Sequence, residues 1–367
     1  MSNKRRNFLR VGALAALGTS AMAGCSPKNE SKIATPNINF NKNYLWKMVT
    51  SWPPNFPVVG EGCNLFSKII EEMSGGRMKI QVYGGGELIP ALETFDAVSN
   101  GAVELGHGAG YYWAGKVAEG QFFASVPFGM NTQQAMAWII NGGGNTLWEE
   151  IYAPFDLLPI VCGSTGAQMG GWFNKEINSI QDLDGLKMRI PGLGGKVLNK
   201  AGGTAVTVAG GEIFTNLERG VIDATEWIGP YHDYIMGFHR VAKYYYYPGW
   251  HEPGSILELL INKPKFYSLP SDLQSIIRQA SARVNTWIWL EFESKNSIYV
   301  KKFKEEGVVP RAFPTEVLAN LKIYTNEVLA ELTESSESAK RIYEAYESFR
   351  TGINGWAELS EKVYYKS

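Results

Sequence analysis

Strand and helix patterns alternate along the first part of this sequence. Residues 44–49 and 78–82 have the composition and spacing of strands, whereas apolar residues recur at helical spacing over 60–74 and 92–98. Glycines follow both helical segments and the second strand. Because parallel strands need a crossover connection, this order predicts an α/β layer with a largely parallel sheet.

The same theme returns downstream. Residues 186–190 predict another strand, and 212–218 predict a short helix that stops at Gly220. At ~150 residues per domain, a chain of 367 residues can form two domains or two lobes around one cleft. Further on, 271–306 predicts one long helix and 314–346 is helical again. We expect two α/β halves followed by long C-terminal helices.

Charge and composition exclude several classes of protein. The chain has 35 Lys and Arg against 36 Asp and Glu, a formal net charge of -1. With no excess of positive charge to hold phosphates, nucleic acid is not an expected partner. A chain that is 45% hydrophobic and 19% charged is neither disordered nor a polytopic membrane protein.

The N-terminus predicts export. A basic stretch with paired arginines at 4–10 precedes a short apolar run at 11–23, which resembles a twin-arginine signal. The run is shorter than the ~20 residues of a membrane-spanning helix, which favours a cleaved signal over 1–24. Cys25 follows small residues, as at a bacterial lipoprotein cleavage site, so we expect either lipidation of Cys25 or plain cleavage nearby. The mature protein would then work in the periplasm or at the cell surface, with 25–42 as a flexible tether.

Two further cysteines, Cys63 and Cys162, remain after such processing. An oxidising compartment would permit a disulfide between them. Cys63, however, lies on the apolar face of a predicted helix, and Cys162 lies in an apolar strand pattern. We therefore favour two buried thiols.

Several cofactor motifs are incomplete. The segment 192–197 has the Gly-Lys pair of a phosphate loop, but Ile190 and Val197 stand where glycine and a hydroxyl residue are needed. The glycines at 84–86 lack the third glycine of a dinucleotide fingerprint, which would fall on Ile89. No pair among the four histidines has the spacing of a zinc motif. We expect neither a nucleotide nor zinc.

A set of polar residues in aromatic and glycine-rich segments remains. Gln168, Arg189, Glu226 and Glu252 would converge at strand ends, where open α/β sheets bind ligands. An arginine held there can grip a carboxylate through two parallel hydrogen bonds, although a structural ion pair is the alternative. The aromatic run 111–113 offers an amphipathic wall for a small anion.

Four segments in one order carry a family resemblance. They are Gln168 to Phe173, Gly185 to Arg189, Gly220 to Trp227 and Tyr244 to Trp250. They resemble the extracytoplasmic solute-binding subunit of tripartite ATP-independent periplasmic (TRAP) transporters, DctP-type, in the subgroup that binds 2-oxo acids such as pyruvate. The resemblance covers nearly the whole mature chain. It implies an α/β, two-lobed periplasmic-binding-protein-like fold, with a ligand cleft between lobes and long C-terminal helices.

The resemblance also implies roles for single residues. Arg189 would clamp the ligand carboxylate, and Gln168 and Glu226 would contact both the ligand and a bound cation. Trp227 would add its backbone carbonyl to the cation, and Glu252 would contact the ligand.

The rim of the pocket and the lobes follow from the same resemblance. Tyr111 or Tyr112 would cap the pocket, and the sequence does not decide which ring points inward. The expected boundaries are 43–165 with 251–300 for lobe I, 166–250 with 301–330 for lobe II, and 331–367 for a C-terminal helical segment.

A count of charges supports the cation independently. Arg189, a monocarboxylate ligand, Glu226 and Glu252 together carry a net charge of -2, which is costly to bury without a cation or a proton. Oxygen ligands suit a hard ion such as sodium or calcium rather than zinc or copper. The resemblance favours Na⁺ for 2-oxo acids, and a Ca²⁺-linked site for a lactate-like hydroxy acid is the alternative.

We therefore expect a non-enzymatic receptor that closes its lobes on a small monocarboxylate and delivers it to the membrane permease subunits of a TRAP system. The related subgroup allows a homodimer through a C-terminal helix, and membrane contact would come only through a lipid anchor. One rival is an exported enzyme with Glu226 and Glu252 as an acid–base pair, which leaves Arg189 without a role. The other is an exported sensor that signals through a partner.

Overall fold

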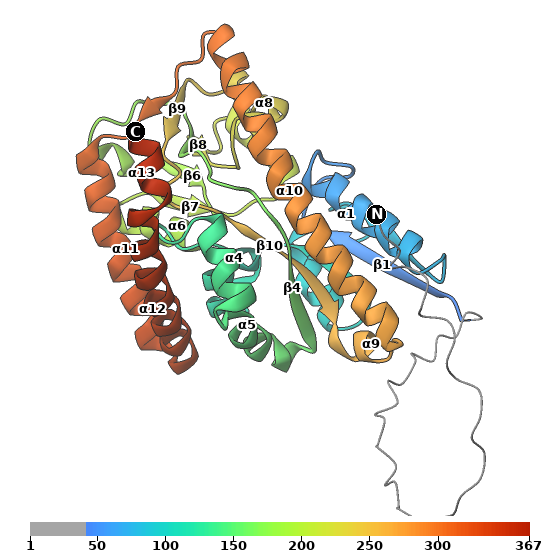
Figure 1. Ribbon diagram of the computed structural model, residues 1–367. Helices are drawn as coiled ribbons and strands as arrows, with labels where there is room; N and C mark the ends of the chain where they lie inside the picture. The colour runs from blue at the N-terminus through green and yellow to red at the C-terminus, as the bar shows by residue number, and fades with distance from the viewer. Residues whose placement is uncertain (1–41) are drawn as a thin grey trace, which may run out of the picture. The chain divides into compact units, whose positions relative to one another are not determined.

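Residues 42–367 are described in the computed structural model (Figure 1). The export signal predicted at 1–24, the lipidation site Cys25 and, except for Lys42, the predicted tether lie outside the described residues. No helix within 42–367 is both long enough and apolar enough to cross a bilayer.

The first sheet has the strand order β2-β1-β3-β10-β4. Its strands are β1 (Tyr44–Thr50), β2 (Met78–Tyr83), β3 (Leu105–Gly108), β4 (Leu157–Ser164) and β10 (Ile256–Asn262). The helices α1 (Val59–Met73) and α2 (Thr94–Ser99) follow β1 and β2 along the chain. Strands β1, β2 and β3 are parallel, which confirms the predicted alternation, whereas β10 runs antiparallel to both of its neighbours.

The second sheet has the order β11-β9-β5-β8-β6-β7. Its strands are β5 (Gly171–Phe173), β6 (Lys187–Arg189), β7 (Thr204–Val206), β8 (Ala224–Thr225), β9 (Tyr244–Tyr247) and β11 (Arg311–Ala312). Its helices are α6 (Gly192–Lys200), α7 (Ile213–Glu218) and α8 (Pro230–Met236). Strands β6, β7 and β8 are parallel, and the two α/β halves expected from the sequence are confirmed.

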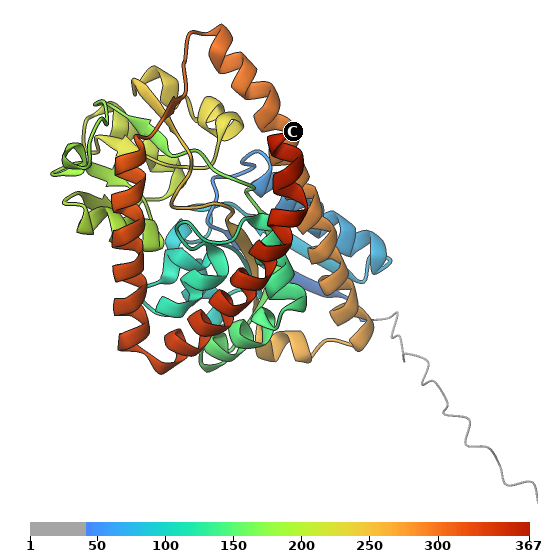
Figure 2. The same cartoon turned by 60° about the vertical axis from the view of Figure 1, so that its left-hand side comes forward.

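Long helices connect and cover the sheets (Figures 1 and 2). The helix α10 (Ser271–Glu305) contacts β4 of the first sheet as well as α1 and α8. The remaining helices are α3 (Gln121–Ala124), α4 (Thr132–Asn141), α5 (Gly144–Tyr152), α9 (Lys263–Tyr267), α11 (Thr315–Ser335), α12 (Glu337–Leu359) and α13 (Glu361–Lys366). Helix α11 packs on α6, whereas α12 packs on α4 and α5, so the α11–α12 pair contacts elements of both halves.

The helical segment predicted at 314–346 differs from the structure in one respect. It contains two helices with a break at Ser336, after which α12 turns back along α11. The Ser336 hydroxyl accepts a hydrogen bond from the backbone N–H of Ala339 at 3.3 Å and donates one to Glu119 at 2.6 Å. Because serine favours helix N-caps, the hydrogen bond from Ala339 to the Ser336 hydroxyl fixes the start of α12.

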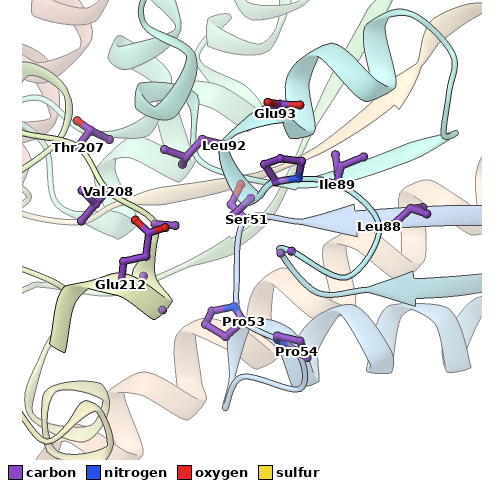
Figure 3. Close-up of a pocket in the computed structure, with 17 residues that line it drawn as sticks. Ser51, Pro53, Pro54, Leu88, Ile89, Leu92, Glu93, Thr207, Val208 and Glu212 are labelled. Carbon is purple, nitrogen blue, oxygen red and sulfur yellow. The ribbon is translucent and has the colours of Figure 1, made fainter. Parts of the chain in front are cut away.

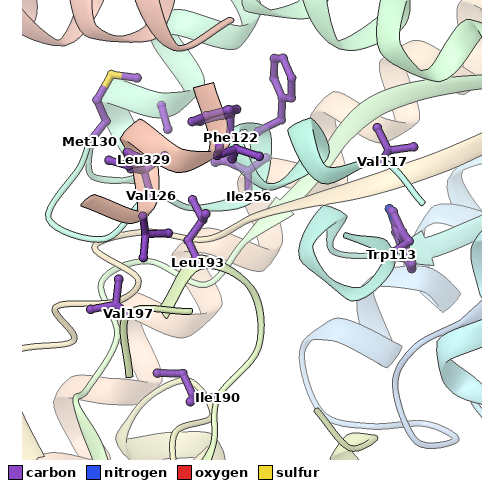
Figure 4. Packing of buried hydrophobic residues seen from close by; sticks show 14 of the residues in the cluster. Trp113, Val117, Phe122, Val126, Met130, Ile190, Leu193, Val197, Ile256 and Leu329 are labelled. Atoms are coloured by element: carbon purple, nitrogen blue, oxygen red, sulfur yellow. The ribbon is translucent and has the colours of Figure 1, made fainter. Parts of the chain in front are cut away.

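Buried side chains of both halves meet in one apolar cluster. Leu193 and Val197 of α6 belong to the same cluster as Val126, Ile256 and Leu329 (Figure 4). Burial of this surface favours contact between the halves, because each Å² of apolar area removed from water contributes about 25 cal/mol.

The two remaining cysteines are free and buried, which confirms the prediction of buried thiols. Burial raises the pKa of Cys63 well above its usual value and raises the pKa of Cys162 to about 12. Neither thiol is therefore activated at neutral pH.

Candidate functional site

The site is organised by Arg189 and Glu226. Arg189 ends β6, and Glu226 directly follows the neighbouring strand β8. Arg189, the last residue of β6, lies in register with Thr225 of β8, so Glu226 comes directly after the paired position. The backbone N–H of Glu226 donates to the carbonyl of Arg189 at 3.2 Å. The Arg189 Nη1 group forms an ion pair with the Glu226 carboxylate and also donates to its backbone carbonyl at 3.3 Å. Each side chain is only 1% exposed.

Arg189 retains one free donor. Its Nη2 group donates to the hydroxyl of Tyr112 at 3.3 Å, and its guanidinium lies 5.1 Å from the ring centroid of Trp227. Burial alone would lower the pKa of Arg189, but the neighbouring Glu226 outweighs it and the pKa is raised. The buried Nε has no hydrogen-bond partner among residues 42–367. A permanently charged side chain therefore offers an unused N–H inside the site.

Gln168 and Glu252 form a second pair next to the first. The amide Nε2 of Gln168 donates to Glu252 Oε2 at 2.6 Å and to Thr165 Oγ1 at 3.1 Å. The other amide atom, Oε1, is buried without a hydrogen-bond partner in the described part of the chain. Burial, followed by the nearby charge of Glu226, raises the pKa of Glu252 to about 7.

The backbone fixes this second pair. The N–H of Gly249 donates to the carbonyl of Gln168 at 3.0 Å, and the N–H of Glu252 donates to the carbonyl of Gly249 at 3.1 Å. A Cβ atom at Gly249 would lie 2.6 Å from the carbonyl carbon of Gln168, so only glycine permits the two segments to come this close. Gln168 and Glu252, far apart in sequence, are thereby held side by side.

His251 is the site residue that sequence reasoning missed. Its Nε2 lies 3.3 Å from Glu226 Oε2, and its buried Nδ1 has no hydrogen-bond partner within 42–367. Ligand atoms of Glu226, His251 and Glu252 all lie within 4.8 Å of one another. A motif search for histidine pairs cannot find such a group, because its members come from separate segments. Its position next to Glu252 in the chain was the available signal.

The two predicted tyrosines lie on a short 3₁₀ turn, Gly110–Trp113, and are partly buried. Their rings meet edge to face with centroids 4.8 Å apart. The Tyr112 hydroxyl reaches Arg189, which settles the direction of that ring. Burial, and then the charge of Glu252, raises the pKa of Tyr111 well above its usual value. Both rings therefore border the charged cluster.

Trp227 borders the cluster next to the guanidinium of Arg189. Its ring meets Trp52 and Phe56 of the β1–α1 loop edge to face, with centroids 6.4 Å and 6.1 Å apart. A Cβ atom at Gly210 would lie 2.5 Å from the far edge of this ring. The indole thus links the second sheet to a loop of the first and separates Arg189 from Gly210.

A pocket of about 730 Å³ opens beyond Gly210 (Figure 3). It is lined by the loops that follow β1, β2 and β7, including Pro53, Leu92 and Val208. None of the six predicted ligand residues lines it. Of its lining residues, Ser51 directly precedes Trp52 in the chain and Gly210 lies against the indole of Trp227.

The donor set fits a small anion held together with a hard cation. The free N–H of Arg189 suits a carboxylate, and the free amide oxygen of Gln168 next to the Glu226 carboxylate suits Na⁺ or Ca²⁺. Five of the predicted residues, Gln168, Arg189, Glu226, Trp227 and Glu252, are at most 6% exposed. Burying several charged groups together is costly in desolvation free energy, and such clusters are typical of functional sites.

Comparisons with known proteins agree with this geometry. The family model of the bacterial extracellular solute-binding proteins, family 7 (DctP), matches residues 48–336. The chain is 39% identical to the monocarboxylate 2-oxoacid-binding periplasmic protein of Nostoc sp., over 98% of each chain.

Two solved structures are similar over almost their whole length. A TRAP periplasmic solute-binding protein from Pseudoalteromonas atlantica T6c, with bound sodium and pyruvate, has a TM-score of 0.87 and 38% identity. One from Colwellia psychrerythraea, with bound calcium and pyruvate, has a TM-score of 0.86 and 39% identity. Each match covers 89% of this chain and 99% of the other. These likenesses bear out the two-lobed fold expected from the sequence.

Proposed function

The chain belongs to the DctP family of bacterial extracellular solute-binding proteins of TRAP type, and we propose that it captures a small 2-oxo monocarboxylate such as pyruvate together with a cation. The observation that carries this proposal is the pair of unused polar atoms in one buried cluster, Arg189 Nε and Gln168 Oε1. One is a donor for an anion and the other is an acceptor for a cation. The pyruvate found in two similar structures supports the same ligand class.

Each residue has a distinct task in this proposal. Arg189 grips the ligand carboxylate, while Glu226 keeps the guanidinium charged and oriented. Gln168 and Glu226 contact both ligand and cation, Trp227 adds its backbone carbonyl to the cation, and Glu252 contacts the ligand. The cation supplies the positive charge that two buried carboxylates and an anionic ligand require.

The aromatic residues exclude water from the site. Tyr112 covers the guanidinium and, together with Tyr111, caps the ligand. Trp227 covers the guanidinium from the other side, where a desolvated cation–π contact contributes roughly 2 kcal/mol. In this low-dielectric surrounding, the carboxylate of the ligand interacts more strongly with Arg189 than it would in water.

We propose that the cation is Na⁺ or Ca²⁺, because similar proteins contain pyruvate with sodium in one structure and with calcium in another. Oxygen donors dominate the cluster, as hard cations require. His251 adds one nitrogen, but its Nε2 faces Glu226.

The receptor role is favoured over the enzyme alternative. The enzyme alternative gives Arg189 no role, whereas a receptor uses the unused N–H of this buried guanidinium to hold the ligand carboxylate. We propose that the protein carries out no reaction and delivers its ligand to the membrane permease subunits of a TRAP transporter. A sensor role would use the same site and differ only in the partner.

Two halves of the chain would close on the ligand. We propose lobe I as 43–165 with 251–300, lobe II as 166–250 with 301–330, and 331–367 as a C-terminal helical segment. Opening of the lobes would expose the cluster, and ligand binding would favour the closed form.

Two further features concern location and assembly. We propose that the protein acts in the periplasm, with Cys25 as a lipid anchor that provides its only contact with the membrane. The C-terminal helices expose apolar side chains, and a second copy of the chain would cover them: Trp356, Leu359, Val363, Tyr364 and Tyr365. Sedimentation of the wild type as a dimer and of Leu359→Glu as a monomer would support this assembly, whereas a monomeric wild type would exclude it.

Isothermal titration calorimetry tests the ligand and the cation together. The mature protein is titrated with pyruvate, 2-oxobutyrate and lactate, each in sodium, calcium and chelator-treated buffers. We expect 2-oxo acids to bind only when a cation is present. Tight binding of lactate alone in calcium would move the assignment to hydroxy acids, and no heat with any acid would refute the monocarboxylate assignment.

A further inference from the structure

Glu252 is the one acidic member of the cluster without an ion-pair partner. Arg189 pairs with Glu226, and His251 also faces Glu226. The carboxylate of Glu252 accepts a hydrogen bond from the neutral amide of Gln168 at 2.6 Å, and among residues 42–367 it forms no salt bridge. It is only 4% exposed, so solvent does little to screen its charge.

The charges of the cluster decide which ion neutralises it. Arg189 and Glu226 cancel, so a monocarboxylate ligand leaves one negative charge and an ionised Glu252 adds a second. A divalent ion neutralises the site when Glu252 is charged, and a monovalent ion neutralises it when this charge is absent. Two similar proteins contain the same ligand, pyruvate, one with sodium and the other with calcium. A ligand of constant charge thus occurs with ions of different charge.

We propose that Glu252 sets the charge of the cation that binds with the ligand, an inference that rests on the function proposed above. Its carboxylate admits a divalent ion, and its removal leaves a site suited to a monovalent ion. Glu252 need not be a ligand of the ion for this effect, because a buried charge acts over several ångströms in a medium of low dielectric constant.

The geometry permits a clean substitution. Glu252→Gln keeps the shape of the side chain and an oxygen that accepts the hydrogen bond from Gln168. The backbone contacts of Gly249 with Gln168 and with Glu252 do not involve the carboxylate. Glu258→Gln is a matched control, because Glu258 is a fully buried glutamate whose partner is the Tyr152 hydroxyl at 3.2 Å.

The test measures the dissociation constants of Na⁺ and Ca²⁺ by calorimetry, with pyruvate saturating and at the same pH for the wild type and every variant. Coulomb energy scales with the charge of the ion, so the loss of free energy is twice as large for Ca²⁺ as for Na⁺. In Glu252→Gln, a roughly tenfold loss of Na⁺ affinity therefore accompanies a roughly 100-fold loss of Ca²⁺ affinity. Glu258→Gln leaves both affinities unchanged.

The shift in melting temperature caused by each ion without pyruvate is a second readout, independent of the ligand. Glu252→Gln should lose most of the stabilisation by Ca²⁺ and keep more of that by Na⁺. Equal fold-changes for the two ions in Glu252→Gln, in a wild type that binds pyruvate, would overturn this inference alone. A wild type that binds no pyruvate with either ion would overturn the proposed function and this inference with it.

Discussion

Replacing Arg189 by methionine should have two separable effects, on stability and on ligand binding. The substitution removes the charge and the N–H donors but keeps an apolar stem of similar length. It leaves the Glu226 carboxylate, 1% exposed, without its cationic partner. Removing one partner of a buried ion pair costs about 3–5 kcal/mol of unfolding free energy. We expect a lower melting temperature, by roughly 4–7 °C for a protein of this size.

The effect on binding has a different origin. Loss of a buried, charge-assisted contact to the ligand costs at least about 2 kcal/mol, which corresponds to a loss of affinity of about 30-fold or more. Urea denaturation measures the first effect and calorimetric titration with pyruvate measures the second. A second variant, Arg189→Met combined with Glu226→Gln, removes both charges and should recover most of the stability without recovering binding.

A matched control comes from another largely buried ion pair, between Arg77 and Asp272. Arg77→Met should lower the stability as well but leave ligand affinity unchanged, since this pair joins the loop between α1 and β2 to the first turn of α10 and includes no residue of the cluster. The reasoning is refuted if Arg189→Met is as stable as the wild type. It is also refuted if the double variant binds pyruvate within about threefold of the wild-type affinity.

Three further outcomes are expected. Burial raises the pKa of Glu258 to about 8, so the folded chain keeps a proton that the unfolded chain releases above its ordinary pKa of about 4.3. The free energy of unfolding should therefore fall as the pH rises from about 5 to 8, by up to about 1.4 kcal/mol per pH unit. Urea denaturation at several pH values should show a weaker pH dependence for Glu258→Gln, and the same pH dependence as in the wild type would contradict the burial argument. Gly210→Ala places a Cβ 2.5 Å from the ring of Trp227 and should displace the indole. We expect calorimetry to show pyruvate affinity reduced roughly 3- to 10-fold, whereas wild-type affinity in this variant would show that the ring position is unimportant. Peptide mapping after brief thiol labelling should find Cys63 and Cys162 unmodified in the folded protein and modified in denaturant; rapid labelling of either in the folded state would contradict their burial.

The parts of the fold that depend on local pattern could be predicted from the sequence. The alternating segments between 44 and 99 were recognised because each helix has an apolar face and each ends near a glycine. The position of β10 could not be recognised, since its seven residues are all buried and carry no alternation. Its insertion between β3 and β4, antiparallel to both, is a pairing between segments far apart in sequence. Such pairings leave no local signal.

The site residues also divide into features that the sequence predicts and features that depend on the folded chain. Arg189 and Glu226 were recognisable because one ends a strand and the other directly follows one, each in a characteristic segment, and the structure pairs them. Gln168 and Glu252 were named separately, but their hydrogen bond depends on the close approach at Gly249. The structural pairing of Arg189 with Glu226 also shows that carboxylate binding and a structural ion pair, treated as alternatives in the sequence, are compatible. One guanidinium has enough donors for both.

A crystal structure of the protein with pyruvate in a sodium buffer would locate the ligand and the cation together. We expect density for the ligand carboxylate against Arg189 and for a cation against Gln168 and Glu226, inside the ring of aromatic side chains. Ligand density in the open pocket beside Gly210, or pyruvate at Arg189 without any cation, would contradict this expectation.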